Sequence, residues 1–177
     1  MKKHSLTDLQ RISVDDFKQA TKTPIVIVLD NVRSLHNVGS VFRTADAFRL
    51  QAIYLCGITA TPPNKEIHKT ALGSTDSVDW QYFAQTTEAL QQLKAANYRI
   101  IAVEQTDSSL LLPAMQPQTN EQYALVFGNE VYGVSEEALT YCEQALEVPQ
   151  IGTKHSLNIS VCMGIVVWDF VSKWQIL

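Results

Sequence analysis

The chain lacks most of the patterns by which common protein classes are identified. It has only 3 cysteines among 177 residues and no CxxC pair, which disfavours a disulfide framework and a zinc site. Its 14 basic and 18 acidic residues give a formal net charge of −4, so any nucleic-acid site must be local. Its most apolar late run, residues 157–168, is interrupted by polar residues and is too short to span a bilayer. We therefore expect a cytoplasmic globular protein with reduced thiols and no membrane segment or resident metal.

Familiar nucleotide-binding and hydrolase signatures are also missing. No G-x-G-x-x-G pattern follows the first apolar run, which disfavours a Rossmann-type dinucleotide site. GNEVYG has the glycine spacing of a P-loop, but Val134 stands where a phosphate-binding lysine is needed. No serine occupies a G-x-S-x-G elbow. His155 directly precedes Ser156, but neighbours in sequence rarely form a productive dyad, so a triad hydrolase is disfavoured.

What the chain does have is a regular alternation of strand and helix patterns. TPIVIVLD, ending at Asp30, is a continuous apolar run typical of a strand covered on both faces. Further strands are expected within 52–57, 78–83, 99–105, 122–130 and 145–150, and helices within 38–49, 86–98, 135–144 and 156–174. This alternation predicts an α/β fold with a mainly parallel sheet sandwiched by helices. Residues 1–23 are expected to form a short helical extension, with Ser13 and Asp16 in a capping arrangement, before the main domain of residues 24–177.

Four loops that follow the expected strands carry most of the unusual residues. They are DNVRSLHNVG, EQTDSS, FGNEVYG and VPQIGTKHS, and three of them contain Gly39, Gly128, Gly133 and Gly152. Ligands of open α/β sheets bind beyond the carboxyl ends of the strands. Glycine at such positions permits unusual dihedral angles or a close approach of the backbone to a ligand. The sequence therefore predicts a binding site built from these loops.

Three of these segments, taken together, resemble the sequence motifs of a known family. LDNVRSLHNVGSVFRTADAF, LVFGNEVYGVS and VPQIGTKHSLNISVCMGI are similar to the three motifs of the SpoU (TrmH-like) RNA 2′-O-ribose methyltransferases of the SPOUT superfamily, in the same order. The resemblance covers roughly residues 25–170. It implies a C-terminal deep trefoil knot, bound S-adenosylmethionine, tRNA or rRNA as substrate, and a homodimer with the active site at the subunit interface.

The same resemblance implies roles for particular residues. The implied catalytic residues are Asn37 and Arg43 of the first motif, Glu130 of the second, and Ser156 and Asn158 of the third. The implied cofactor-binding residues are Glu104, Gly128, Val148 and Leu157. The resemblance implies that Arg43 acts as general base. Because a guanidinium gives up its proton reluctantly, the alternative role is that Arg43 anchors phosphate and stabilises the developing oxyanion. Cys162 departs from the alanine that is common in the family.

Structural alternatives exist for each of these residues. Asn37 and Ser156 are residue types that cap helices, and Glu130 is suited to an interface ion pair. Val161 and Ile165, with Leu157, are expected to hold the last helix in the core. Positive charge for a phosphate path would come from Arg33, His36, Arg43, Lys154 and His155, and Tyr132 could stack on a base. A knotted RNA-binding protein without catalysis and an unrelated nucleotide-binding protein are the competing hypotheses.

Overall fold

A seven-stranded parallel sheet forms the centre of the protein. The computed structural model describes residues 11–175. The strand order is β3-β2-β1-β6-β4-β7-β5, and every neighbouring pair is parallel. The strands are β1 (Thr23–Asp30), β2 (Leu50–Cys56), β3 (Trp80–Phe83), β4 (Tyr98–Val103), β5 (Leu110–Leu111), β6 (Gln122–Phe127) and β7 (Gln144–Glu147). The expected α/β fold with a parallel sheet is confirmed.

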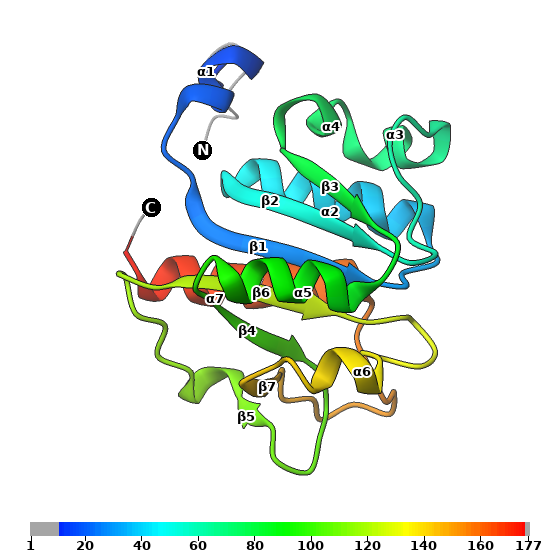
Figure 1. The fold of residues 1–177 in the computed structure, drawn as a ribbon, viewed down its shortest axis with the longest axis vertical. Helices are drawn as coiled ribbons and strands as arrows, with labels where there is room; N and C mark the ends of the chain where they lie inside the picture. The colour runs from blue at the N-terminus through cyan, green and yellow to red at the C-terminus, as the bar shows by residue number, and fades with distance from the viewer. Residues whose placement is uncertain (1–10, 176–177) are drawn as a thin grey trace, which may run out of the picture.

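Helices cover both faces of this sheet (Figure 1). The two long helices α2 (Leu35–Ala47) and α7 (Ile159–Lys173) lie on one face, and α5 (Thr86–Ala95) lies on the other, as does the short α6 (Glu136–Leu139). The shorter helices α3 (Lys65–Ala71) and α4 (Ser74–Ser77) pack beside α2, and a 3-10 turn, η2 (Leu112–Ala114), contacts α7. Among residues 11–175, no helix is long and apolar enough to cross a membrane.

Alternation along β1 explains why its sequence is apolar without interruption. Ile25, Ile27 and Leu29 face the core layer that contains α2 and α7, whereas Val26 and Val28 face the layer that contains α5. All five side chains are at most 1% exposed. Successive side chains of a strand point to opposite faces, so a strand covered on both faces needs an apolar residue at every position.

The N-terminal helix α1 (Val14–Gln19) is short but tied to the rest of the protein. Ser13 accepts a hydrogen bond from the backbone N–H of Asp16 at 3.1 Å, which confirms the expected cap. Phe17 is buried in the core layer of α2 and α7. Residues 1–10 of the expected extension lie outside the described residues.

The structure corrects the expected start and orientation of the last helix. Helix α7 begins at Ile159 with Asn158 as its N-cap, so Ser156 neither starts nor caps it. Val161 and Ile165 are 52% and 38% exposed, not buried as expected. The buried stripe is Ile159, Met163, Val166, Val167 and Phe170, which follows the helical repeat from residue 159. This run is apolar on more than one face, so its pattern alone does not decide which side chains pack against the sheet.

The first-motif helix and α6 also differ from expectation in their limits. Helix α2 begins at Leu35 rather than at residue 38, and Ser34 is its N-cap, so the capping alternative for Asn37 is wrong. Helix α6 covers only four residues of the expected 135–144 segment. Because all strands are parallel, the loops after β1, β4, β6 and β7 nevertheless emerge at the same edge of the sheet, as predicted.

Candidate active site

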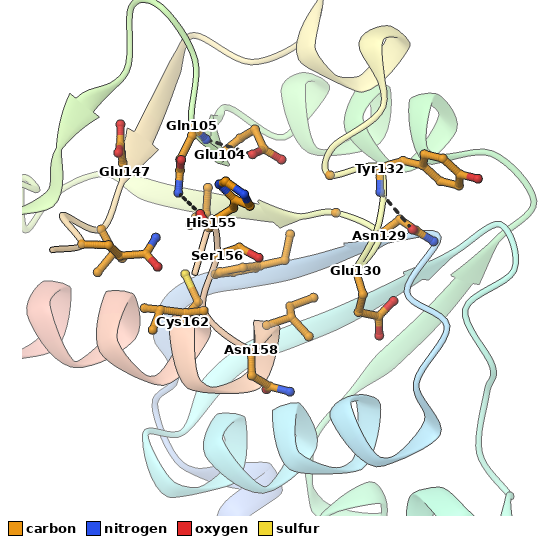
Figure 2. A pocket seen from close by; sticks show the side chains of 18 of the residues that line it. Glu104, Gln105, Asn129, Glu130, Tyr132, Glu147, His155, Ser156, Asn158 and Cys162 are labelled. Carbon is orange, nitrogen blue, oxygen red and sulfur yellow. Dashed lines mark hydrogen bonds between the residues drawn. The ribbon is translucent and has the colours of Figure 1, made fainter. Parts of the chain in front are cut away.

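A cleft of about 580 Å³ lies at the carboxyl edge of the sheet, between β4, β6, β7 and the start of α7 (Figure 2). The loops after β4, β6 and β7 form its walls. Its lining contains all four residues expected to bind a cofactor and three of those expected to act in catalysis. These are Glu104, Gly128, Val148, Leu157, Glu130, Ser156 and Asn158. Asn37 and Arg43 do not line it. Residues of the second motif, the third motif and the loop after β4, far apart in sequence, thus meet at one cleft.

The second-motif loop is shaped by two glycines and one asparagine. Gly133 has φ +71°, and the backbone amide and carbonyl of Asn129 and Gly133 pair with each other at 2.9 Å in both directions. A Cβ on Gly128 would lie 2.0 Å from the carbonyl carbon of Gly133, so no larger residue fits there. The Asn129 side chain accepts from the N–H groups of Val131 and Tyr132 and donates to the carbonyl of Asn31. The loop is therefore held in one conformation by its own backbone.

One hydrogen-bonded chain connects the three motifs. The carboxylate of Glu130 accepts from the backbone N–H groups of Arg33 and Ser34, both at 2.9 Å, and from Nδ2 of Asn37 at 3.0 Å. Nδ2 of Asn158 donates to Oδ1 of Asn37 at 3.1 Å. Asn37 thus bridges the second motif to the third, and it lies within the first turn of α2. Asn158 also caps α7, because its Oδ1 accepts from the N–H of Ser160 at 2.9 Å.

The environment of Glu130 favours its ionised form. Burial raises its pKa, but the N–H groups of Arg33 and Ser34 and the Asn37 amide outweigh burial, and the net pKa lies below the ordinary value. The carboxylate sits at the N-terminus of α2, where the helix dipole also favours negative charge. A carboxylate of lowered pKa with three donors is a weak proton acceptor. Glu130 therefore holds the loop after β6 against the loop after β1.

Glu104 makes a similar lock between the β4 and β6 loops. Its carboxylate accepts from the backbone N–H of Gln105 and from that of Val134, both at 2.9 Å. A Cβ on Gly133 would lie 2.2 Å from Oε2 of Glu104, which explains the glycine at this position. Glu104 lines the cleft, and its contacts fix the wall opposite α7.

The third-motif loop, residues 148–158, forms the remaining wall of the cleft, beside the loops after β4 and β6. Nε2 of Gln105 donates to the carbonyl of His155 at 2.8 Å, which ties this loop to the end of β4 (Figure 2). Sequence reasoning missed Gln105, and no pattern in the sequence indicates this contact. It also left out Asn129 as a site residue, although Asn129 stands between the two matched residues Gly128 and Glu130. Ile151 to Ser156 are all exposed.

Arg43 is the one expected catalytic residue that stands apart. It is exposed, lies on α2 six residues after Asn37, and does not line the cleft. Six residues rotate the side chain by about 240° and move it about 9 Å along the helix axis. Within one chain, the structure therefore brings Asn37, Glu130 and Asn158 together and leaves Arg43 outside.

The electrostatics of the cleft suit a cationic ligand. Its lining includes Glu104, Glu130 and Glu147 and contains no lysine or arginine. Burial raises the pKa of the Cys162 thiol to about 11, and the nearby Glu104 contributes, so Cys162 is a neutral wall residue rather than a nucleophile. Apolar contact is available from Val148, Leu157 and Ile159. The arrangement can bind a nucleoside-sized molecule that carries positive charge.

Comparison with known proteins identifies the family. The family model for the SpoU rRNA methylase family matches residues 24–168. The chain belongs to the SpoU rRNA methylase family. It is 28% identical over 153 residues to the "23S rRNA (guanosine-2′-O-)-methyltransferase RlmB" of Neisseria meningitidis, covering 86% of this chain but only 60% of that protein.

Other SpoU relatives and structures agree with this membership. The "tRNA (guanosine(18)-2′-O)-methyltransferase" of Thermus thermophilus is 25% identical over 163 residues, covering 92% of this chain and 82% of that protein. The fold matches the AdoMet-bound rRNA methyltransferase from Sinorhizobium meliloti with a TM-score of 0.80 at 24% identity, covering 91% of this chain and 60% of that one. This SpoU chain thus spans about three fifths of the length of two of these three proteins.

Proposed function

We propose that this SpoU chain transfers a methyl group from S-adenosylmethionine to a ribose 2′-hydroxyl of tRNA or rRNA. The observation that carries the proposal is the hydrogen-bonded chain from Glu130 through Asn37 to Asn158, which joins all three motifs beside one cleft. The named activities of the Neisseria and Thermus relatives, both RNA guanosine 2′-O-methyltransferases, support it.

The cleft fits S-adenosylmethionine on its own chemistry. Its volume of about 580 Å³ falls within the usual range for small-ligand sites. Gly128, Val148 and Leu157 line it and would contact an adenosyl group, and the three glutamates of the lining complement the sulfonium and ammonium charges. The rRNA methyltransferase from Sinorhizobium meliloti, which has the same fold, binds AdoMet in its crystal structure. When bound, the cofactor supplies an electrophilic methyl group.

The chain's own residues must align the ribose oxygen with that methyl carbon. They must also accept the proton of the ribose 2′-hydroxyl. The new carbon–oxygen bond forms as the carbon–sulfur bond breaks, the electron pair remains on sulfur, and the hydroxyl proton leaves. Asn37 and Asn158 hold each other in place, and Ser156 and Asn158 provide polar side chains at the cleft. Alignment of this kind contributes a large part of the rate. Glu130 keeps the loops in register, since its lone pairs are already engaged.

Arg43 would act from the interface of a homodimer. Arg43 does not line the cleft of its own chain. Helix α7, which packs against the helix that carries Arg43, exposes Val161, Ile165 and Trp168. The Trp168 ring lies 6.2 Å from that of Phe48, at the end of α2, so the apolar surface extends across both helices. A second copy of the chain on this surface would bring an arginine toward the cleft. There Arg43 would anchor phosphate and stabilise the developing oxyanion, or accept the proton.

A C-terminal trefoil knot and a methyltransferase domain of residues 24–177 complete the proposal. Strand β7 lies between β4 and β5 although it comes later in the chain, so the 104–109 connection must cross the end of β7. The following helix α7 is held against the 112–117 segment. There the Lys173 ammonium donates to three backbone carbonyls and the Trp174 indole N–H donates to that of Pro117. This is the arrangement that threading of the last segment through an earlier loop would produce.

Methyl transfer from labelled S-adenosylmethionine tests the function. The substrates are small RNA and ribosomal RNA from cells that lack this enzyme, with the label located in ribose by nuclease digestion. We expect labelled ribose with the wild type and at least a hundredfold less with Arg43→Ala, because charge stabilisation at the reacting oxygen is lost. Arg11→Ala is the matched control, since Arg11 is exposed and precedes the family-matched segment.

Cofactor binding, measured by calorimetry on the same samples, separates the alternatives. Binding of S-adenosylmethionine without transfer to any RNA would favour the catalytically inert knotted RNA-binding protein. Absence of both binding and transfer would contradict the proposal altogether. An equal loss in Arg11→Ala and Arg43→Ala would remove Arg43 from the site.

A further inference from the structure

A second pocket of about 550 Å³ is lined by residues of α3, α4 and β3 and by the loop before α3, and shares no lining residue with the first cleft. Its apolar lining residues are Pro62, Pro63, Ile67 and Trp80 of the edge strand β3. Ile67 is fully buried, whereas Trp80 is 37% exposed. An exposed indole and two proline rings thus line one apolar slot. Such a slot accepts a planar ring of about the size of a nucleobase.

Polar groups around this slot match the rest of a nucleotide. Lys65 and His68 line it, are exposed, and form no ion pair within the described residues. The Oδ1 of Asn64 caps α3 by accepting from the N–H of Glu66 at 2.9 Å, and no contact within residues 11–175 uses its Nδ2. Asp76 provides an acceptor at the opposite wall. The pocket thus combines a stacking surface, a cation for a phosphate, and a donor and an acceptor for a base or a ribose.

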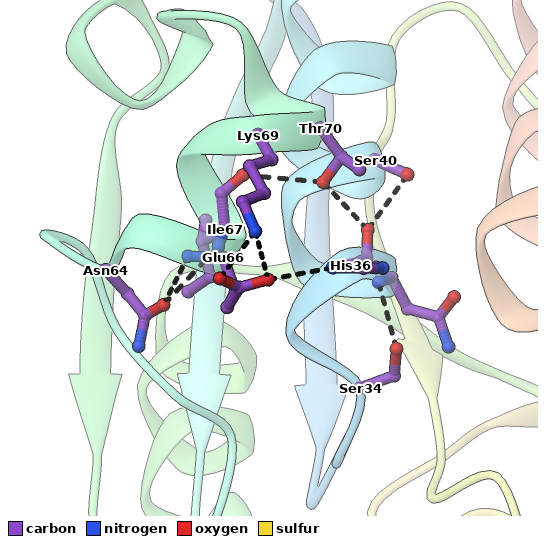
Figure 3. A network of polar contacts seen from close by, with 9 residues as sticks. Ser34, His36, Ser40, Asn64, Glu66, Ile67, Lys69 and Thr70 are labelled. Atoms are coloured by element: carbon purple, nitrogen blue, oxygen red, sulfur yellow. Dashed lines mark hydrogen bonds and ion pairs between the residues drawn. The ribbon is translucent and has the colours of Figure 1, made fainter.

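Helix α3 couples this pocket rigidly to the first-motif helix (Figure 3). The Thr70 hydroxyl donates to the carbonyl of His36 at 3.0 Å, and Nε2 of His36 lies 3.2 Å from Glu66, which also pairs with Lys69 at 2.8 Å. A Cβ on Gly39 would lie 2.3 Å from the carbonyl oxygen of Ile67, so the two helix backbones are nearly in contact.

The charge on α3 faces two ways. Lys65 and His68 line the pocket, while Glu66 contacts His36 of α2, the helix that carries Asn37, and pairs with Lys69. Glu66 is already neutralised by Lys69 and His36, which hold its pKa below the ordinary value. Helix α3 has seven residues and is therefore about 10 Å long. A short stretch of RNA strand spans that distance.

We propose that the α3 pocket is a subsite for one unpaired nucleotide of the RNA substrate. The base stacks on Trp80 and Pro63, and the adjoining phosphate is held by Lys65 and His68. The inference rests on the proposed function in that RNA is the substrate. It adds a binding site for a nucleotide other than the one that reacts. Because α3 packs directly against α2, binding at this site orients the RNA strand relative to Asn37.

Fluorescence anisotropy of a labelled short single-stranded RNA, titrated with the full chain, tests the subsite. Trp80→Ala should weaken binding about fivefold to tenfold, and Trp80→Phe should restore most of it, because a phenyl ring still stacks. Lys65→Ala should weaken binding and lower the slope of log affinity against log salt by about 0.7, the value for one phosphate contact on a single strand. Lys94→Ala, an exposed lysine on α5, is the charge-matched control and should change neither quantity.

Two further measurements decide between the subsite and its alternatives. In methyl-transfer assays, Trp80→Ala should raise KM for RNA and leave kcat and S-adenosylmethionine binding unchanged. Wild-type affinity in Trp80→Ala and Lys65→Ala, an equal loss in Lys94→Ala, or uridine monophosphate binding as tightly as the oligonucleotide would each overturn the subsite. If the wild type methylates no RNA while Trp80 and Lys65 still govern RNA binding, the subsite stands and the proposed function fails.

Discussion

The two ends of the parallel sheet hold their carboxylates in different ways. At the carboxyl end, Asp30, Glu104 and Glu130 each accept hydrogen bonds from backbone N–H groups of distant loops. At the amino end, Glu121 and Glu143 accept from side chains instead. Both accept from the guanidinium of Arg99, at 3.0 and 3.1 Å, and Glu121 also accepts from the Tyr123 hydroxyl. Both ends satisfy their charges. Only the carboxyl end uses them to fix the path of the chain.

The difference explains why the cleft lies where it does. A backbone N–H cannot rotate away from its loop, so a carboxylate that binds two of them determines the relative position of two segments. An ion pair between partly exposed side chains contributes little and is screened by salt. The amino end therefore tolerates motion of its side chains, whereas the loops at the carboxyl end are held in place by bonds to their backbone. Preorganisation of this kind is what a catalytic cleft requires.

Removal of the Asp30 carboxylate should have the largest effect on stability. Asp30 is 1% exposed and accepts from the Thr86 hydroxyl and from the N–H of Ser135. Asp30→Ala leaves these donors buried without a partner and should lower the free energy of unfolding by about 3 kcal/mol. Urea unfolding measures it, and a change below about 0.5 kcal/mol would contradict the central place given to backbone-bound carboxylates.

A methyl group at Gly128 should distort the cleft directly. Its Cβ would overlap the backbone of Gly133, so Gly128→Ala should cost about 2 kcal/mol of stability and weaken S-adenosylmethionine binding at least tenfold. Gly164→Ala is the matched control in α7, where an added Cβ meets nothing within 4 Å. The control should bind cofactor normally and gain about 0.5 kcal/mol from reduced chain entropy. Similar behaviour of the two variants would show that the tight loop is not needed.

Glu130→Gln should produce a smaller effect that depends on pH. The pKa of Glu130 is lowered on folding, so its stabilisation is fully present above the ordinary glutamate pKa of about 4.3 and is lost as pH falls through the folded value. At neutral pH the variant should be about 0.5 to 1 kcal/mol less stable, the usual size of a charge at a helix N-terminus. The gap between wild type and variant should close as the pH falls below the ordinary glutamate pKa and through the lower folded value. A gap that widens on acidification would reverse the assignment.

Glu143→Gln, at the amino end, should have the smallest effect. The side chains of Arg99 and Glu143 are 37% and 50% exposed, so the pair is open to water. The expected loss is about 0.3 kcal/mol and should vanish in about 1 M salt. Thermal unfolding at low and high salt, compared with Glu130→Gln, sharpens the contrast between the two ends. A loss as large as that of Asp30→Ala would abolish the contrast.

Much of the fold could be predicted because local patterns agree with their tertiary setting. The run ending at Asp30 is a strand, and the loops after β4, β6 and β7 meet as parallel topology requires. The errors arose where two signals compete. Ser156 looks like a cap before an apolar run, but Asn158 takes that role. The expected stripe of Leu157, Val161 and Ile165 and the observed stripe from Ile159 are both apolar, so apolar spacing alone did not decide which face is buried.

By itself, the sequence determined the alternation of strands and helices, because that depends on periodicity, and it contained the three motifs. Their resemblance to the SpoU family implied seven of the residues that line the cleft. Only the tertiary structure decided that Glu130 binds Asn37 across 93 residues and that Asn158 reaches Asn37 across 121. It also decided that Arg43 stays outside the cleft and that Trp80 and Lys65 border a second pocket. Contacts of this range follow from how the sheet orders its strands, and no local pattern encodes that order.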